Sequence, residues 1–445
     1  MDQILNAQDL SLFEEDYEKR DGLKKLQNNI LRHGINESCI DESLYHEMKD
    51  VFSVEVKTGK VTNQRQSGRC WMFAGLNVLR EILKETLNVK EIELSQAYLQ
   101  FYDKLEKANF FLEKGLEHAD EELDSRDNVF LLDSALGDGG HFHMFTNLVK
   151  KYGVVPFDVM PDEAVSKNTS ELNQVLTRYL MQGYLGLREA KREGAKQEVL
   201  ETMKQGYLND VYRILKMSLG NPVSSFTYEY EDKDGKFVRL ENLTPKQFYE
   251  RYLKEELDDY ICLADAPLNG MKQYQKYTCD LVNNVIGGDP VIFFNVPLSV
   301  MKDALIKSLE DKRPCWFAAD VSTQSLRKEG ILADGILQRK ELFSLNYTLN
   351  KSKRANLRAS FCNHAMTFTG VNLVDGVPNR YKVQNSWGEE NGFKGYYLMS
   401  DAWFDEYVYE VFVNKKYLDP EVVEKYEKST IEKQSPYNTL WIEME

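Results

Sequence analysis

A cysteine with the surroundings of a nucleophile occurs in the segment QRQSGRCW, residues 64–71. Apolar residues follow it at positions 72, 73, 76, 79, 82 and 83, so the sequence predicts a buried helix that begins at Cys70. A helix N-terminus favours the reactive thiolate, and its first-turn N–H groups are oriented to donate to an oxyanion. Gln64, six residues upstream in a loop, offers a second donor from its side-chain amide. We expect the remaining thiols to be inert and buried: Cys39, Cys262, Cys279, Cys315 and Cys362.

The thiol also needs a base, and His364 has the most suitable neighbours among the six histidines. It opens the strand-like stretch HAMTFTGVNLV, which is followed by an Asp375-Gly376 turn and a second stretch, RYKVQNSW. If the turn is a two-residue hairpin, His364 lies opposite Trp387, and Asn385 lies two places away on the same face. Asn385 would then orient the imidazole, and Trp387 would shield the hydrogen bond from water. A longer turn would change this register.

The stretch GDGGHFHMF contains two adjacent glycines, Gly139 and Gly140. Because they carry no side chain, we expect a substrate backbone to approach them and pair as an extra strand. Two other interpretations stay open. One is a metal site of His141 and His143 with Asp138, although no recognisable spacing supplies a further ligand. The other is a tight turn that leads into a helix.

The composition is that of a large, acidic protein with extensive apolar cores. Its 445 residues are about three times the usual domain length, and 42% of them are hydrophobic. The net charge of −15 argues against nucleic acid as the main partner. No apolar run reaches the length of a membrane span, and the start MDQILNAQDL lacks the pattern of a secretory signal. Together with six scattered cysteines without a CxxC motif, this predicts a cytoplasmic protein with reduced thiols.

Changes in sequence character divide the chain into an N-terminal segment, two lobes, an insertion and a tail. We expect residues 1–60 to wrap the core and residues 61–164 to form a helical lobe that carries the nucleophile. Long charged helical stretches predict a helical insertion over residues 165–285. Strand-like segments from PVIFFNV onward predict a β-rich lobe over residues 286–416, which carries the histidine and the asparagine. Residues 417–445 form a C-terminal arm, and the fold class is α+β.

Three motifs, QRQSGRCW, NHAM and QNSWG, occur in the order found in papain-like cysteine peptidases. The flanking text, from about residue 10 to about residue 415, resembles most the bleomycin hydrolase and aminopeptidase C branch. The resemblance implies a two-lobe papain-like fold with a helical lobe and an antiparallel, barrel-like β lobe. It also implies that Cys70 is the nucleophile, His364 the acid–base, Asn385 its orienter and Gln64 the oxyanion donor, with no metal and no organic cofactor.

The interval between the cysteine and the histidine supports the assignment to this branch. It is 294 residues long, whereas papain-type sequences have about 130–150. The branch is known for helical insertions that assemble a homohexameric barrel with the active sites facing inward. The resemblance therefore implies peptide substrates and self-association, with no membrane partner.

The C-terminal arm bears on which end of a peptide is recognised. In this branch the arm lies in the active-site cleft, and its terminal carboxylate holds the substrate's α-amino group, which makes these enzymes aminopeptidases. This chain ends in SPYNTLWIEME, which departs from the Pro-Trp-Asp-Pro-Met-Gly pattern of the branch. Glu443, Glu445 and the terminal carboxylate still offer partners for an ammonium group. Alternatively the arm misses the cleft, as a frayed surface tail does, and the protein is an oligopeptide endopeptidase. An inactive hexameric scaffold is the remote alternative.

Overall fold

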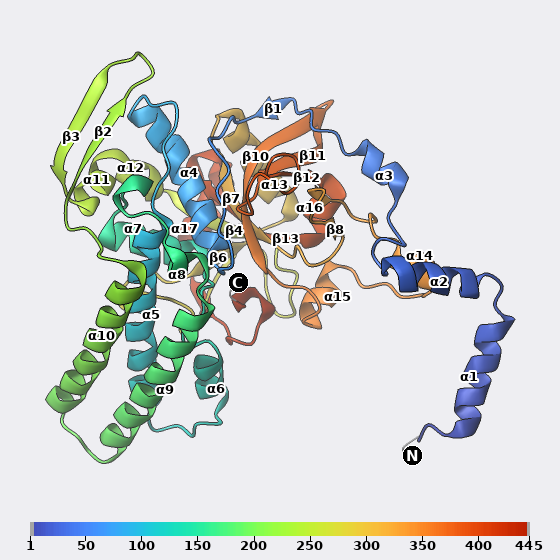
Figure 1. Ribbon diagram of the computed structural model, residues 1–445, viewed down its shortest axis with the longest axis horizontal. Coiled ribbons are helices and arrows are strands. Elements are labelled where there is room, and N and C mark those ends of the chain that lie inside the picture. Colours follow the sequence, from blue (N-terminus) through green and yellow to red (C-terminus); the bar gives the residue numbers. More distant parts are fainter. Residues whose placement is uncertain (1–3, 443–445) are drawn as a thin grey trace.

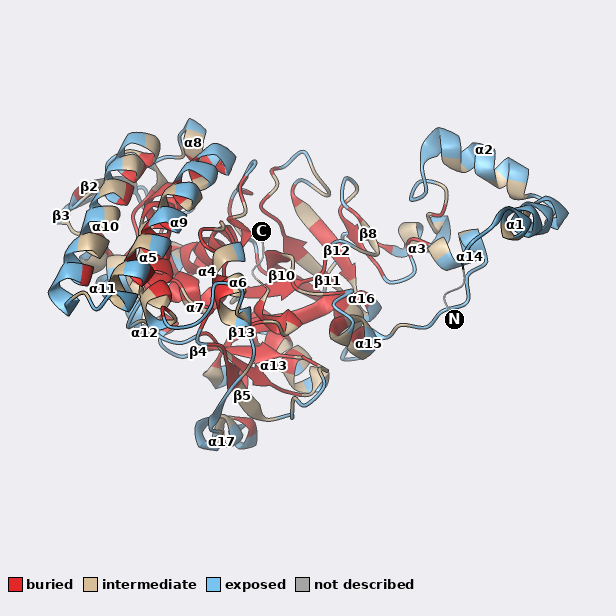
Figure 2. Ribbon diagram, turned by 90° about the horizontal axis from the view of Figure 1, so that it is seen from below, coloured by how far each residue is buried: buried red, intermediate tan, exposed pale blue. Residues whose placement is uncertain are grey.

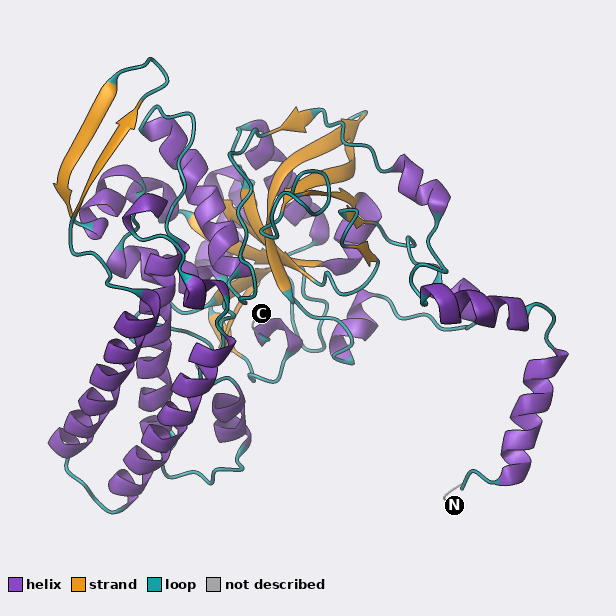
Figure 3. Ribbon diagram, viewed as in Figure 1, coloured by secondary structure: helices purple, strands orange, loops and turns teal. Residues whose placement is uncertain are grey.

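The computed structural model describes residues 4–442, except for the side chains of residues 255–256. Helices gather on one side of a central sheet, and the N-terminal segment projects from the opposite end of the molecule (Figures 1 and 3). One apolar core lies between the sheet and the helical lobe, and a second lies on the other face of the sheet. The expected α+β class is confirmed. None of the described helices is long and apolar enough to span a membrane.

The helical lobe is built around the helix that begins at the candidate nucleophile. This helix, α4 (Cys70–Thr86), is buried at every position from Cys70 to Leu83, because its apolar residues surround the first turns. The predicted buried helix is therefore confirmed. It packs against the sheet on one side and against the other helices of the lobe on the other. These helices are α5 (Gln96–Glu117), α6 (Arg126–Asp133) and α7 (Phe142–Tyr152).

The insertion extends the helical lobe but is not wholly helical. Two long helices, α9 and α10, lie beside α5 as an extended bundle (Figure 1). A β2–β3 hairpin follows, because Phe226, Tyr228 and Tyr230 alternate with polar residues as in a strand. The strands of the β-rich lobe also begin earlier than expected, at Tyr260. The elements are α8 (Ala164–Lys167), α9 (Ser170–Arg192), α10 (Gln197–Leu219), β2 (Phe226–Glu231), β3 (Phe237–Leu243), α11 (Pro245–Tyr252), α12 (Lys254–Leu257), β4 (Tyr260–Ala264) and β5 (Gln275–Thr278).

A twelve-stranded mixed sheet forms the centre of the molecule, in the order β14-β5-β6-β4-β13-β7-β10-β11-β12-β9-β8, with β1 paired to β10. Helices α13 (Leu298–Glu310) and α16 (Asp401–Tyr407) cover the face opposite the helical lobe. Its further strands are β1 (Val54–Glu55), β6 (Ile292–Asn295), β7 (Cys315–Ala319), β8 (Ser325–Leu326), β9 (Ile331–Leu332), β10 (His364–Val374), β11 (Val377–Gln384), β12 (Tyr396–Ser400), β13 (Val408–Asn414) and β14 (Ile431–Lys433). Short helices complete the chain: α3 (Glu42–Glu47), η1 (Phe157–Val159), α14 (Arg339–Phe343), α15 (Lys351–Asn356), η2 (Lys415–Tyr417), α17 (Pro420–Lys428) and η3 (Thr439–Trp441).

Strands β10 and β11 form the predicted two-residue hairpin, in which Val374 pairs with Val377. Away from the turn, the pairing register shifts by one residue between Leu373 and Asn372. An opposite shift between Gly370 and Phe368 restores it. Because side chains alternate between the two faces of a sheet, a single shift would have turned the start of β10 to the wrong side. The two irregularities cancel, so His364 keeps the side that the turn predicts.

The first helices of the chain differ from expectation. Helices α1 (Ala7–Lys19) and α2 (Leu23–His33) bury no residue and project from the body instead of wrapping it (Figures 1 and 2). The chain joins the body near Cys39, and β1 then pairs with β10. An amphipathic pattern shows that a helix has an apolar side but not what covers it. The exposed apolar side chains of this segment are Ile4, Leu5, Leu10, Leu12, Phe13 and Leu31.

The C-terminal arm stays attached to the body as far as it is described. Strand β14 pairs in parallel with β5 at the edge of the sheet. Beyond it, Leu440 and Trp441 are 3% and 0% exposed and belong to the same apolar cluster as Cys70. The interpretation as a frayed surface tail is therefore wrong for residues 431–442.

Candidate active site

His364 begins strand β10, and its side chain is buried. Its Nε2–H donates to Oδ1 of Asn385 at 2.7 Å. The same oxygen accepts the backbone N–H of Ser386 at 2.8 Å, which identifies it as the acceptor end of the amide. Trp387 covers the pair, with the two ring centroids of His364 and Trp387 4.5 Å apart. The contact predicted between histidine and asparagine is thus present, and Nδ1 is the ring nitrogen left to accept a proton.

Burial governs the protonation of His364. Removal from water lowers the pKa of its imidazole to about 4, while the hydrogen bond with Asn385 opposes this shift and Arg327 adds to it. The ring is therefore neutral near pH 7, which is the state that accepts a proton from a thiol.

Cys70 is the first residue of α4 and is fully buried. Nε1–H of Trp316, in β7, donates to the backbone carbonyl of the residue after Cys70 at 3.0 Å. The hydroxyl of Thr367, in β10, donates to the carbonyl of Ala74 at 3.3 Å. These two bonds hold the start of α4 against β7 and against β10, the strand that begins with His364.

No disulfide joins any of the six cysteines. Burial raises the pKa of the other thiols, which leaves less of the nucleophilic thiolate at neutral pH. The affected residues are Cys39, Cys262, Cys279 (pKa about 11), Cys315 (pKa about 12) and Cys362. These shifts agree with the expectation that they are inert.

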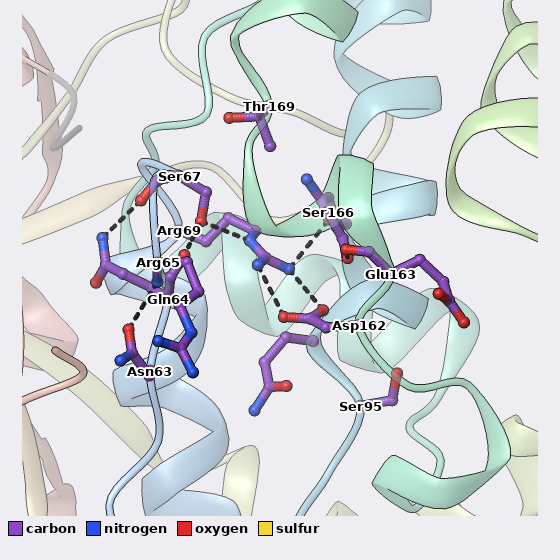
Figure 4. Close-up of polar contacts among 12 residues, drawn as sticks. Asn63, Gln64, Arg65, Ser67, Arg69, Ser95, Asp162, Glu163, Ser166 and Thr169 are labelled. Carbon is purple, nitrogen blue, oxygen red and sulfur yellow. Dashed lines mark hydrogen bonds and ion pairs between the residues drawn. The ribbon is translucent and has the colours of Figure 1, made fainter. Parts of the chain in front are cut away.

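Gln64 lies in the loop before α4 and connects it to the loop after β11. Its backbone N–H donates to Ser386 O at 2.8 Å, and Asn63 forms an antiparallel bridge with Trp387. The Ser386 hydroxyl donates to Gln64 Oε1 at 2.6 Å. Gln64 Nε2 donates to Ser67 O at 2.7 Å (Figure 4). These contacts fix which end of the amide carries the donors. One N–H of Nε2 is engaged by Ser67, and the second is the candidate donor to an oxyanion.

The two glycines before α7 have a packing role. A Cβ on Gly140 would lie 2.8 Å from the ring of Trp71, so only glycine leaves room for the ring next to the nucleophile. Gly139 is buried as well, and its carbonyl accepts a hydrogen bond from Lys107. Their expected contact with a substrate backbone stays a prediction.

Asp138 has partners that leave little room for its interpretation as a metal ligand. Its carboxylate accepts from the N–H of Gly68 at 3.1 Å, from Lys104 Nζ at 2.6 Å and from Asn173 Nδ2 at 2.9 Å. Burial acts to raise its pKa, but Lys104 and the hydrogen bonds hold that pKa well below its usual range. In the described part of the chain, the two histidines after it form no metal-ligating cluster with it. Asp138 instead joins the nucleophile loop to α5 and α9.

Ser386 and Asp138 are positioning residues that sequence reasoning missed. Both stand inside motifs that it did single out, QNSWG and GDGG. Nothing in the sequence indicated that Ser386 would reach Gln64, because the two are 322 residues apart. The predicted substrate-binding Glu445 lies outside the described residues, as does Glu443.

Comparisons with known proteins identify the family of the chain. The profile of the Peptidase C1-like family matches residues 4–440. Aminopeptidase C of Listeria innocua is 41% identical over 405 residues, which is 91% of each chain. Aminopeptidase G of Lactobacillus delbrueckii subsp. lactis is 38% identical over 99% of this chain and 100% of its own.

A solved structure extends the similarity to the fold. The crystal structure of PepW from Lactobacillus rhamnosis covers 100% of both chains with a TM-score of 0.96 and 39% identity. The expected papain-like fold is thereby confirmed. The protein belongs to the Peptidase C1-like family and is a cysteine-type peptidase.

Proposed function

We propose that the protein is an aminopeptidase that hydrolyses peptides through an acyl-enzyme on Cys70. The observation that carries this proposal is a convergence of segments far apart in the chain. The start of α4 is bonded to β7 and β10, the His364–Asn385 pair lies at the start of β10, and Ser386 joins that pair to Gln64. Relatives named aminopeptidase C, G and W support the substrate class.

In the proposed reaction, Cys70 gives its proton to Nδ1 of His364, and the sulfur attacks the carbonyl carbon of the peptide bond. The Cys70 N–H and Gln64 Nε2–H donate to the oxyanion that forms. His364 returns the proton to the leaving amine, and a thioester remains on Cys70. His364 then takes a proton from water, whose oxygen attacks the thioester, and the thiol recovers that proton as the acid leaves.

Replacing the nucleophile tests the mechanism. Iodoacetamide should alkylate Cys70 first among the thiols, with one label per chain, and hydrolysis should be lost in proportion. Cys70→Ala should be inactive, whereas Cys279→Ala, a buried thiol with a raised pKa, should keep its activity. Full activity in Cys70→Ala, or equal labelling of all six thiols, would refute the mechanism.

The position of the arm supports cleavage at free N-termini. The Trp441 ring packs against Phe293, with centroids 4.9 Å apart, and Phe293 in turn lies edge-on to the ring of His141, the residue after Gly140, with centroids 5.5 Å apart. An arm held against this segment blocks peptide residues upstream of the scissile bond, which disfavours substrates without a nearby free amino group. A carboxylate at its end, such as Glu445, would pair with that amino group.

A matched pair of peptides tests this specificity. The intact protein should cleave a peptide with a free N-terminus about ten- to hundred-fold faster than its N-acetylated form, as one buried ion pair of roughly 1–3 kcal/mol allows. Truncation before Thr439 should slow cleavage of the first peptide and accelerate cleavage of the second. Rapid internal cleavage of the acetylated peptide by the intact protein, unchanged by truncation, would establish an endopeptidase instead.

The proposal includes a cytoplasmic homohexamer without nucleic-acid or membrane partners. The resemblance to the bleomycin hydrolase branch and the acidic net charge of −15 support it. The exposed apolar side chains of α1 and α2 also support self-association, because an unpartnered apolar surface of this kind marks an interaction site.

A further inference from the structure

A buried arginine occupies the position immediately before the candidate nucleophile. Arg69 is the N-cap residue of α4, yet its side chain makes no capping hydrogen bond, unlike the short polar residues usual there. Its guanidinium is 1% exposed and forms a two-pronged ion pair with Asp162, with both N···O distances 3.0 Å. Figure 4 shows this pair. Arg69 also donates to Gln100 Oε1 at 3.0 Å. A buried charge with this many partners requires a reason beyond helix capping.

The fourth contact of this guanidinium leads to the oxyanion donor. Arg69 Nε–H donates to Ser67 Oγ at 2.9 Å, and the Ser67 hydroxyl in turn donates to the carbonyl of Gln64 at 2.6 Å. The backbone carbonyl of Ser67 accepts the Gln64 Nε2–H. Asp162, Arg69, Ser67 and Gln64 thus form one hydrogen-bonded series, whose last member is the candidate oxyanion donor.

The loop before α4, which contains Gln64, has a backbone conformation that needs the support of these hydrogen bonds. Arg65, which follows Gln64, has a φ of 56°, a left-handed conformation that is unfavourable for a residue with a long side chain. The Asn63 side chain accepts the Arg65 N–H at 2.9 Å on one side of this turn. On the other side, Ser67 is the residue that Arg69 holds.

We infer that Arg69, fixed by Asp162, is a positioning residue that sets the Gln64 amide for the oxyanion through Ser67. The inference rests on the proposed acyl-enzyme mechanism. The ion pair is neutral as a whole, so it acts through geometry and not through a field at the nucleophile. Its loss should therefore slow steps in which an oxyanion forms and leave the reactivity of the thiol itself unchanged.

Two conservative substitutions interrupt the series without removing the arginine charge from its pocket. Ser67→Ala deletes the hydroxyl that links Arg69 to Gln64. Asp162→Asn keeps the side-chain volume but removes the negative charge and one of the two oxygens that accept from Arg69. Each should lower kcat for an aminoacyl amide by about ten- to hundred-fold, since small displacements of a positioned group carry costs of this size. Alkylation of Cys70 by iodoacetamide forms no oxyanion, so its rate in Ser67→Ala, which leaves the neutral ion pair intact, should stay within about twofold.

A double-mutant cycle separates positioning from a general structural role. In a Gln64→Ala background, Ser67→Ala should lower kcat by less than about twofold, because the group it positions is absent. Glu85→Gln is the matched control, since it removes the carboxylate of another arginine ion pair on α4, with Arg313, and should leave kcat within about twofold.

Three results would overturn the inference while leaving the proposed role of Gln64 intact. These are equal costs of Ser67→Ala in both backgrounds, alkylation that slows together with hydrolysis, and normal kcat in both Ser67→Ala and Asp162→Asn. Gln64→Ala alone reports on the proposed function. Normal hydrolysis by that variant would refute the oxyanion role of Gln64, and this inference with it. A loss of about 10²-fold or more in Gln64→Ala would preserve that role whatever the other variants show.

Discussion

At the residue scale, His364 and Asn385 contribute unequally to the proposed proton transfer. In the proposed mechanism the imidazole accepts the proton of the thiol, whereas the amide only holds the ring through the 2.7 Å bond to Nε2. The ring of Trp387, which packs beside the imidazole, also limits its movement. Loss of the orienting residue should therefore be milder than loss of the base.

Alanine substitutions measure this difference. His364→Ala should lower kcat by about 10²–10⁴-fold, because the general base is removed. Asn385→Ala should lower it by about ten- to hundred-fold, because the ring is retained but less well oriented. Steady-state kinetics on an aminoacyl amide measures both, with unfolding midpoints as the control for folding. A larger loss in Asn385→Ala would contradict the assigned roles.

A second buried group, Glu410 on β13, carries a cost that depends on pH. It is 0% exposed, and burial raises its pKa to about 8, against a smaller opposing effect of the Cys362 thiol. The unfolded chain releases this proton near pH 4.5, so folding keeps a proton that the unfolded chain has lost. The stability contribution is present below pH 4.5 and is lost as the pH rises through about 8.

Glu410→Gln should remove this dependence. Between pH 5 and 8 the variant should gain stability relative to the wild type by up to about 1.4 kcal/mol per pH unit, and the gain should level off above pH 8. Urea unfolding at pH 6, 7.5 and 9 measures the difference. Glu432→Gln, at an exposed position on β14, is the control and should show no such trend. A difference between Glu410→Gln and wild type that does not change with pH would disprove the assignment.

At the scale of elements, the arm is attached at several points of unequal strength. Trp441 is fully buried against Phe293, whereas the hydroxyl of Tyr437 makes one exposed bond to the carbonyl of Arg126. Loss of a buried tryptophan side chain costs about 3–5 kcal/mol, and loss of one exposed hydrogen bond about 1 kcal/mol or less. Trp441 is therefore the main anchor of residues 431–442.

Trp441→Ala should release the end of the arm while the lobes stay folded. We expect faster hydrolysis of N-acetylated peptides and slower hydrolysis of peptides with a free N-terminus. Limited proteolysis should also begin to cut within residues 434–442. Tyr437→Phe, which keeps the ring and loses the hydroxyl, should behave like the wild type. If the specificity of Trp441→Ala is unchanged although proteolysis shows a released arm, the arm does not select the N-terminus.

At the scale of the whole molecule, the N-terminal helices are separate from the core that stabilises the fold. Helices α1 and α2 bury no residue, and Leu10, Phe13 and Leu31 are all more than half exposed. Their removal should cost the single chain little stability, because no buried contact is lost. In the proposed homohexamer these apolar side chains would be covered by another copy of the chain.

Deletion of residues 1–33 tests this division. The shortened protein should keep a thermal midpoint within about 2–4 °C of the wild-type chain at low concentration, since a change below roughly 1 kcal/mol shifts it by no more than this. Sedimentation at micromolar concentration should show a smaller assembly than that of the full chain, whose monomer mass is 51.7 kDa. An unchanged assembly would show that the contacts lie elsewhere, for example on α9 and α10.

The sequence by itself determined those parts of the site that depend on nearby residues. The helix at Cys70 follows from consecutive apolar positions, and the relation of His364 to Asn385 follows from a two-residue turn between adjacent strands. Local patterns act over a few residues, so they can be recognised from the sequence before the fold is known. Even here the two compensating shifts in the pairing register of β10 and β11 could not be predicted from the sequence, because bulges depend on packing against other strands.

Only the tertiary structure decided how distant segments meet. The bond from Ser386 to Gln64, the ion pair of Arg69 with Asp162 and the burial of Trp441 join residues from different lobes and loops. From the sequence we likewise expected residues 1–60 to wrap the core, whereas helices α1 and α2 project from it. Hydrogen bonds and burial between remote segments are specified by the packed shape of the whole chain, to which every residue contributes a little. Such contacts leave no local pattern, whereas the nucleophile and its base each do.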